Sequence, residues 1–188
     1  MEIVHYPHPA LRWKSRPISE INADLKKQVA EMFELMYEAR GIGLAANQVA
    51  LPFQLFIINP TGDPEEKDQE FVFINPEITN RKGSAEGEEG CLSLPELYAP
   101  VRRSSEISVE AFDLDGRPFE LELDGLPARV VQHELDHVLG VLFIDRVTDS
   151  VRRELESDLQ AFESYFRHEQ ESGRYPDDSV LKAELEKL

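Results

Sequence analysis

The sequence has 188 residues but only one cysteine, and it contains no long apolar run. A lone cysteine cannot form a disulfide within the chain, which fits a reducing compartment better than secretion. Because no stretch approaches the roughly 18 apolar residues of a membrane-spanning helix, the sequence predicts no membrane partner. Its first residues also lack the pattern of a signal or transit peptide. We therefore expect a cytoplasmic protein.

Positive charge is scarce as well. The chain holds 20 Lys and Arg against 37 Asp and Glu, which gives a formal net charge of −17. Phosphate backbones attract basic surfaces, so this balance argues against direct binding of nucleic acid. The length is that of one ordinary domain with a core of its own.

Two histidines stand four residues apart in the segment QHELDH (132–137). In an α-helix such positions share a face, so His133 and His137 could bind one metal ion. Glu134 is rotated by about 100° from His133, which leaves its carboxylate beside the ion, where it could act on a water molecule. The alternative is a polar helix face that carries two solvated histidines.

A catalytic metal needs a third protein ligand, and the residues after the histidines offer one kind. In the metzincin pattern a histidine would follow Gly140 by three positions, but that position holds Phe143, which cannot bind a metal. A thermolysin-like enzyme uses a glutamate on a following helix instead. Glu154 and Glu156 are available, so this alternative stays open.

The other candidate third ligand is Cys91, in the segment EGEEGCLSLP (86–95). Gly87 and Gly90 should free the backbone to turn sharply, so that a loop presents the thiolate. Two imidazoles and one thiolate would leave a fourth position for water, as catalytic zinc sites do, whereas structural zinc sites are closed by four protein ligands. Three good ligands and a well-placed base favour catalysis over a purely structural metal.

A third polar position occurs in RGIGLAANQVALP (40–52), whose glycines are suited to ending the preceding helix. The spacing of a dinucleotide-binding loop is missing there. Gln48 stands among small and apolar residues, and an amide can donate a hydrogen bond to a developing oxyanion. The alternative interpretation is that Gln48 is a surface glutamine without a catalytic role.

Together these segments resemble the three signature motifs of the peptide deformylases, in the right order. The segments are GIGLAANQ (41–48), EGCLS (89–93) and QHELDH (132–137), and the likeness extends to VHYPHPALR (4–12) and INPEI (74–78), covering roughly residues 1–148. The resemblance implies hydrolytic removal of the formyl group from the N-terminal methionine of nascent chains, with release of formate. The partners would be N-formylmethionyl peptides.

The resemblance also implies roles for single residues. Cys91, His133 and His137 would hold one divalent metal ion, ferrous iron in most members, with zinc, nickel or cobalt able to replace it. Glu134 would serve as general base and then as general acid. Gln48 and the backbone N–H of Leu92 would form the oxyanion hole.

Substrate binding and support of the metal ligands are implied in the same way. The substrate-binding residues would be Ile42, Gly43, Glu89, Leu126, Arg129 and Val130. We expect Arg129 to lay its aliphatic stem along the pocket wall with its charge in water. Asp136 faces away from the ion by helical phase, and the family pattern implies an ion pair with Arg103.

The chain pattern predicts an α+β fold: a single domain with antiparallel strands surrounding a central metal-binding helix, plus a C-terminal helix. The expected elements are a helix over about 24–40, a buried strand over 53–59, a polar loop over 61–69, extended chain over 70–78, a hairpin over 107–123 that turns at Asp115-Gly116, and the metal-binding helix after Pro127.

We expect the last part of the sequence to lie outside the catalytic domain. We predict a catalytic domain over residues 1–148 and a C-terminal helix with an acidic tail over 149–188, with Asp149 or Ser150 as N-cap. After the glycine and proline break in SGRYP the chain should be mobile or loosely docked. Residues 151–188 hold six Lys and Arg against ten Asp and Glu, which argues against transient contact with the ribosome through this tail.

Overall fold

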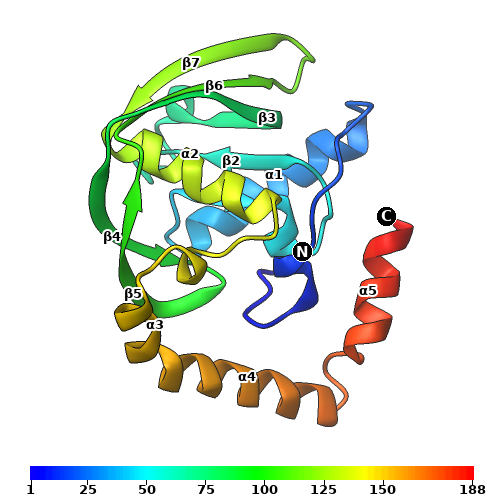
Figure 1. The fold of residues 1–188 in the computed structure, drawn as a ribbon. Coiled ribbons are helices and arrows are strands. Elements are labelled where there is room, and N and C mark those ends of the chain that lie inside the picture. The colour runs from blue at the N-terminus through cyan, green and yellow to red at the C-terminus, as the bar shows by residue number, and fades with distance from the viewer.

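The computed structural model describes all residues from 1 to 188 and has an α+β fold, as predicted (Figure 1). Five strands form an antiparallel sheet in the order β1-β2-β3-β6-β7, and β4 pairs with β5 in a separate hairpin. The strands are β1 (Gly43–Ala45), β2 (Leu55–Ile58), β3 (Phe71–Lys82), β4 (Ala85–Cys91), β5 (Leu94–Arg103), β6 (Glu106–Phe112) and β7 (Pro118–Asp124).

The helices are spread along the whole chain. They are α1 (Ala23–Glu38), α2 (Gly125–Val138), α3 (Asp149–Glu154), α4 (Glu156–Glu171) and α5 (Asp178–Lys187), with the 3-10 helices η1 (Pro9–Arg12), η2 (Ala46–Val49), η3 (Lys67–Gln69) and η4 (Phe143–Asp145). None of them combines the length and apolar composition needed to cross a membrane.

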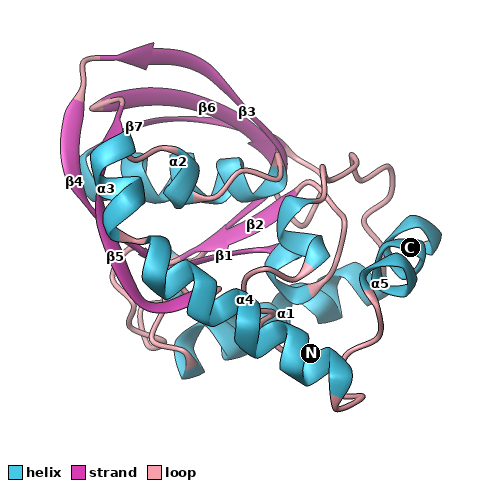
Figure 2. Ribbon diagram, turned by 60° about the horizontal axis from the view of Figure 1, so that its bottom comes forward, coloured by secondary structure: helices cyan, strands magenta, loops and turns pink.

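The helix α2 lies inside the curve of the strands, and α1 covers the opposite face of the sheet at β1 and β2 (Figures 1 and 2). Side chains of a strand alternate between faces. In β2, Leu55 and Ile57 pack in the cluster of α1, while Phe56 and Ile58 pack in the cluster of α2. This double burial explains the apolar run that predicted the strand, and it encloses α2 among the strands as expected.

The predicted hairpin is confirmed by the antiparallel pairing of β6 with β7. Gly116 lies in the turn with a φ of 74°, and Oδ1 of Asp113 accepts hydrogen bonds from the backbone N–H groups of Asp115 and Arg117. The helix α2 begins at Gly125, two residues before Pro127, so Pro127 lies in its first turn.

The end of α1 differs from the prediction. The residue in the left-handed region is Arg40, with a φ of 57°, rather than a glycine. Gly41 has a second role: a Cβ there would lie 2.6 Å from Cδ1 of Leu92, so the glycine lets that side chain approach. Its lack of a side chain therefore permits close packing of two chain segments, while its N–H donates to the carbonyl of Met36 at the end of α1.

Two expectations for the C-terminal part are wrong. The N-cap of α3 is Thr148, whose hydroxyl accepts from the backbone N–H of Val151, and neither Asp149 nor Ser150 has that role. The tail is also docked: Leu181 and Leu185 of α5 are buried, and Leu185 belongs to the core cluster that contains Val4. Two leucines one helical turn apart give α5 an apolar stripe long enough to hold it against the body.

Candidate metal centre

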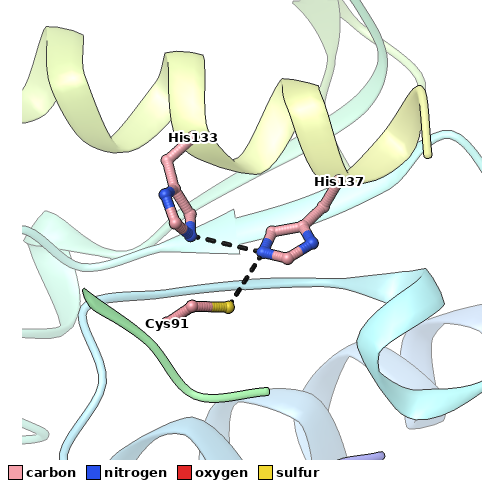
Figure 3. Close-up of side chains that lie close together, drawn as sticks. All are labelled: Cys91, His133 and His137. Carbon is pink, nitrogen blue, oxygen red and sulfur yellow. Dashed lines mark hydrogen bonds between the residues drawn. The ribbon is translucent and has the colours of Figure 1, made fainter. Parts of the chain in front are cut away.

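The side chains of His133 and His137 project from one face of α2 toward Cys91 at the end of β4 (Figure 3). Nε2 of His133 and Nε2 of His137 are 3.2 Å apart, and Nε2 of His137 lies 3.2 Å from Sγ of Cys91. These three residues are the group whose ligand atoms all lie within 4.8 Å of one another. The helical spacing seen in the sequence thus produces convergent side chains.

This donor set fits a divalent metal ion. Metal–nitrogen bonds of 2.0–2.1 Å in a tetrahedral site correspond to nitrogens about 3.3 Å apart, close to the separation of the two imidazoles. Oε2 of Glu134 is buried and has no hydrogen-bond partner. A buried polar atom without a partner is unfavourable, so its position beside the three ligands indicates that it faces a water or substrate at the centre.

Glu134 is held in a setting that favours its protonated form. Its burial raises the pKa of the carboxyl group to about 7, a value suited to both accepting and donating a proton near neutrality. Gly43 of β1 makes room for this carboxylate, because a Cβ at position 43 would lie 2.5 Å from Oε1 of Glu134.

Gln48 is a buried residue of η2, not a surface glutamine. Its Oε1 accepts from the backbone N–H of Ala45 at 2.8 Å, so its amino group faces the metal centre. That Nε2 donates to Oγ of Ser93 at 3.2 Å and to Sγ of Cys91 at 3.5 Å. The neighbouring Asn47 donates to the backbone carbonyl of His137, which ties η2 to α2.

Cys91 is presented by the end of a strand, so the prediction of a glycine-hinged loop is wrong. Neither Gly87 nor Gly90 has a positive φ. Both lie within β4 and make room for neighbours: a Cβ on Gly90 would lie 2.5 Å from Tyr98, and one on Gly87 would lie 3.0 Å from the guanidinium of Arg129. The register shifts between Gly90 and Cys91, where the hairpin turns back.

A buried ionic network supports the ligands. Glu89 accepts two hydrogen bonds from Arg103, both at 2.9 Å, and one from Nη1 of Arg129 at 2.7 Å. Its Oε2 lies 3.0 Å from Nδ1 of His133. Burial alone would raise the pKa of Glu89, but Arg103 and His133 hold it well below its usual range. The expectation that the charge of Arg129 lies in water is therefore wrong.

The expected ion pair of Asp136 with Arg103 is present. Sequence reasoning missed a second partner, Arg146, whose Nε and Nη2 lie 3.0 Å and 2.6 Å from the two oxygens of Asp136. No motif or periodicity marks Arg146, because the contact depends on how the chain returns after α2. Asp136 thus binds two guanidinium groups, and one of them, Arg103, also binds the Glu89 carboxylate beside His133.

The centre opens into a cleft of about 840 Å³. All the substrate-binding residues expected from the sequence line it, together with Leu92: Ile42, Gly43, Glu89, Leu126, Arg129 and Val130. Sequence reasoning missed Ile3, His5 and Tyr98, which line it as well. Glu154 and Glu156 are exposed residues of α3 and α4 outside the ligand group, so a thermolysin-like ligand set is not formed.

Comparisons with known proteins agree with this geometry. Residues 1–153 match the family model described as polypeptide deformylase. A peptide deformylase of Rhodopirellula baltica is 45% identical over 181 residues, which is 96% of this chain and 90% of the relative. The chloroplastic peptide deformylase 1B of Solanum lycopersicum is 40% identical over 188 residues, 100% of this chain and 66% of that protein.

Solved structures are similar over most of the chain. The crystal structure of Arabidopsis thaliana peptide deformylase 1B in complex with an inhibitor has a TM-score of 0.86 and 44% identity, covering 92% of this chain and 94% of that one. The peptide deformylase of Thermus thermophilus has a TM-score of 0.79 and 40% identity, covering 87% of this chain and 97% of that one.

Replacing Cys91 tests the ligand set. Cys91→Ser exchanges a thiolate for a poorer, protonated ligand, so the purified protein should lose most of its bound metal. Glu156→Ala, the matched control for a ligand on a following helix, should keep a full complement. Metal analysis of both proteins after gel filtration measures the difference. A loss confined to Glu156→Ala would contradict the site described above.

Proposed function

The chain belongs to the polypeptide deformylase family, and we propose that the cleft beside α2 removes the N-formyl group from the N-terminal methionine of nascent polypeptides, releasing formate. The observation that supports this site most strongly is the convergence of Cys91, His133 and His137 in one cleft with the unpaired carboxylate of Glu134. The reaction is the hydrolysis of a formamide, so it needs an activated water, a proton carrier and donors to an oxyanion.

Members of the family are metalloenzymes, and we propose that Cys91, His133 and His137 hold one divalent ion, ferrous iron in preference to zinc, nickel or cobalt. The ion would supply Lewis-acid chemistry, lowering the pKa of a water from about 15.7 towards about 7. Metal analysis of protein purified without oxygen identifies the ion: iron near one per chain supports the proposal, and zinc in its place contradicts the preference.

Glu134 is the proposed proton carrier. Its carboxylate accepts a proton from the attacking water and then donates it to the departing amine of methionine. A pKa of about 7 lets the same group perform both transfers near neutral pH. No other protein group donates to its Oε2, so that oxygen is free for the water.

Gln48 and the backbone N–H of Leu92 are the proposed oxyanion donors. The contact of Ala45 with Oε1 of Gln48 fixes which end of the amide points into the cleft, so the donor is oriented before substrate arrives. The turn after β4 places Leu92 directly beside Cys91. Both donors are therefore within the same site as the ligands.

The cleft is proposed to select formyl groups and methionine by shape. A formyl carbon carries only hydrogen beside its oxygen and nitrogen, whereas an acetyl group adds a methyl that must be accommodated. The close approach of Gly43 to Glu134 leaves little room at the centre. Ile42, Leu126 and Val130 offer apolar contacts for the methionine side chain.

We propose a catalytic unit over residues 1–148, with residues 149–188 packed on the same domain. The enzyme would act in the compartment that synthesises formylated chains, the cytoplasm in a bacterial setting. The excess of acidic residues in 151–188 makes the C-terminal part a poor surface for ribosomal RNA, because phosphates repel it.

Glu134→Gln tests the proton carrier. The amide keeps the shape of the side chain but cannot accept the proton, so bound metal should remain while formate release from formyl-Met-Ala-Ser falls about 100-fold or more. Metal content and formate are measured on the same sample. A variant that retains more than about a tenth of the wild-type rate would show that Glu134 is not the base.

A further inference from the structure

An extended N-terminal segment, residues 3–6, forms one wall of the cleft. Its side chains alternate: Ile3 and His5 line the cleft, with Ile3 also packed against the cluster of α1, while Val4 and Tyr6 are buried in another core cluster. This is the two-residue period of an extended chain that separates two environments. The wall therefore has a substrate side and a core side.

The wall is joined directly to the catalytic residues through the backbone. The N–H of Val4 donates to the carbonyl of Gln48 at 2.8 Å, and the N–H of Tyr6 donates to the carbonyl of Ser93 at 2.9 Å. Ser93 is also the hydroxyl partner of the Gln48 amide. A displacement of residues 3–6 would therefore shift the edge of the cleft nearest the oxyanion donors.

The core side of the wall is held by the C-terminal arm, which we define as residues 156–188. The arm leaves the body after α3 (Figure 1), and α5 packs against η1. The hydroxyl of Tyr6 donates to Oε1 of Glu163 on α4 at 2.7 Å, a contact that spans 157 residues of sequence. Leu185 of α5 packs in the same buried cluster as Val4 and Tyr6.

A second attachment lies just beyond the wall. His8 is buried, and its ring meets those of Phe166 and Tyr175 edge-on, with both centroid distances 5.9 Å. Phe166 and Tyr175 stack on each other at 5.4 Å. The arm therefore contacts the N-terminal chain at several points and is firmly docked.

The cleft has room for more of a substrate than its formylmethionyl group. A volume of about 840 Å³ is in the range of pockets that enclose whole drug-sized ligands, so it exceeds the need of one formylmethionyl group. Of the apolar residues proposed for methionine, Leu126 and Val130 belong to α2 and Ile42 directly precedes β1. Ile3 and His5 line the same cleft from the N-terminal segment, where the residues after methionine could lie.

We propose that Ile3 and His5 bind the part of the substrate peptide that follows methionine, and that the arm positions them through the hydrogen bond from Tyr6 to Glu163. This inference rests on the proposed function. Tyr6 and Glu163 touch no reacting atom and act as positioning residues. The acidic arm then has a role in substrate affinity that its charge alone does not suggest.

Tyr6→Phe removes only the hydroxyl. A hydrogen bond to a charged acceptor stabilises enough for its loss to loosen the wall, so the KM for formyl-Met-Ala-Ser should rise about three- to tenfold with kcat kept within about twofold, the pattern of lost ground-state binding. With formylmethionine amide, which has no residue to reach the wall, kcat/KM should stay within about twofold. Ile3→Ala should give the same split directly.

Matched variants separate positioning from stability. Glu163→Leu should repeat the effect of Tyr6→Phe, whereas Glu163→Gln keeps an acceptor oxygen and should restore most of the affinity. Tyr165→Phe, on an exposed part of α4, is the control and should change neither substrate. Bound metal and melting temperature are recorded for each protein, because a purely structural role would lower the melting temperature without separating the two substrates.

Two results would overturn the inference: a KM that changes equally for both substrates, or tripeptide kinetics that stay unchanged in Tyr6→Phe, Glu163→Leu and Ile3→Ala. Failure of the proposed function has a different signature, since the wild-type protein would then release no formate from either substrate. That result would remove this inference as well.

Discussion

The buried carboxylate of Glu89 joins the two parts of the metal centre. It lies on β4, two residues before Cys91, and it contacts Arg103 of β5 together with Arg129 and His133 of α2. Burying an ion without partners costs several kcal/mol, so the ionised Glu89 depends on these contacts. The hairpin that carries the sulfur ligand is thereby held against the helix that carries the nitrogen ligands.

The same network separates two carboxylates that lie in one small site. Glu89 is surrounded by guanidinium groups and stays ionised, while Glu134 has no donor on Oε2 and its burial raises its pKa to about 7. Environments that drive two pKa values apart assign different roles to like groups. Glu89 holds the hairpin against α2, and Glu134 remains available for proton transfer.

The parts of this site that the sequence predicted are those that local geometry determines. The separation of His133 and His137 and the phase of Asp136 follow from the helical repeat, so the convergence of the two histidines could be derived without a structure. Contacts made by the return of the chain could not be derived: Arg146 meets Asp136 only because the chain turns back after α2, and Gly90 of β4 pairs with Tyr98 of β5, whose ring takes the space of a Cβ. The prediction of a mobile or loosely docked tail was wrong for the same reason.

Glu89→Gln tests most directly whether this carboxylate holds the centre together. The amide leaves Arg129 without a counter-charge and Arg103 with Asp136 alone, so the free energy of unfolding in urea should fall by about 3–5 kcal/mol, and metal affinity should fall about 10- to 100-fold. Glu86→Gln, an exposed position on the same strand, should change neither. Wild-type stability and metal affinity in Glu89→Gln would contradict the account.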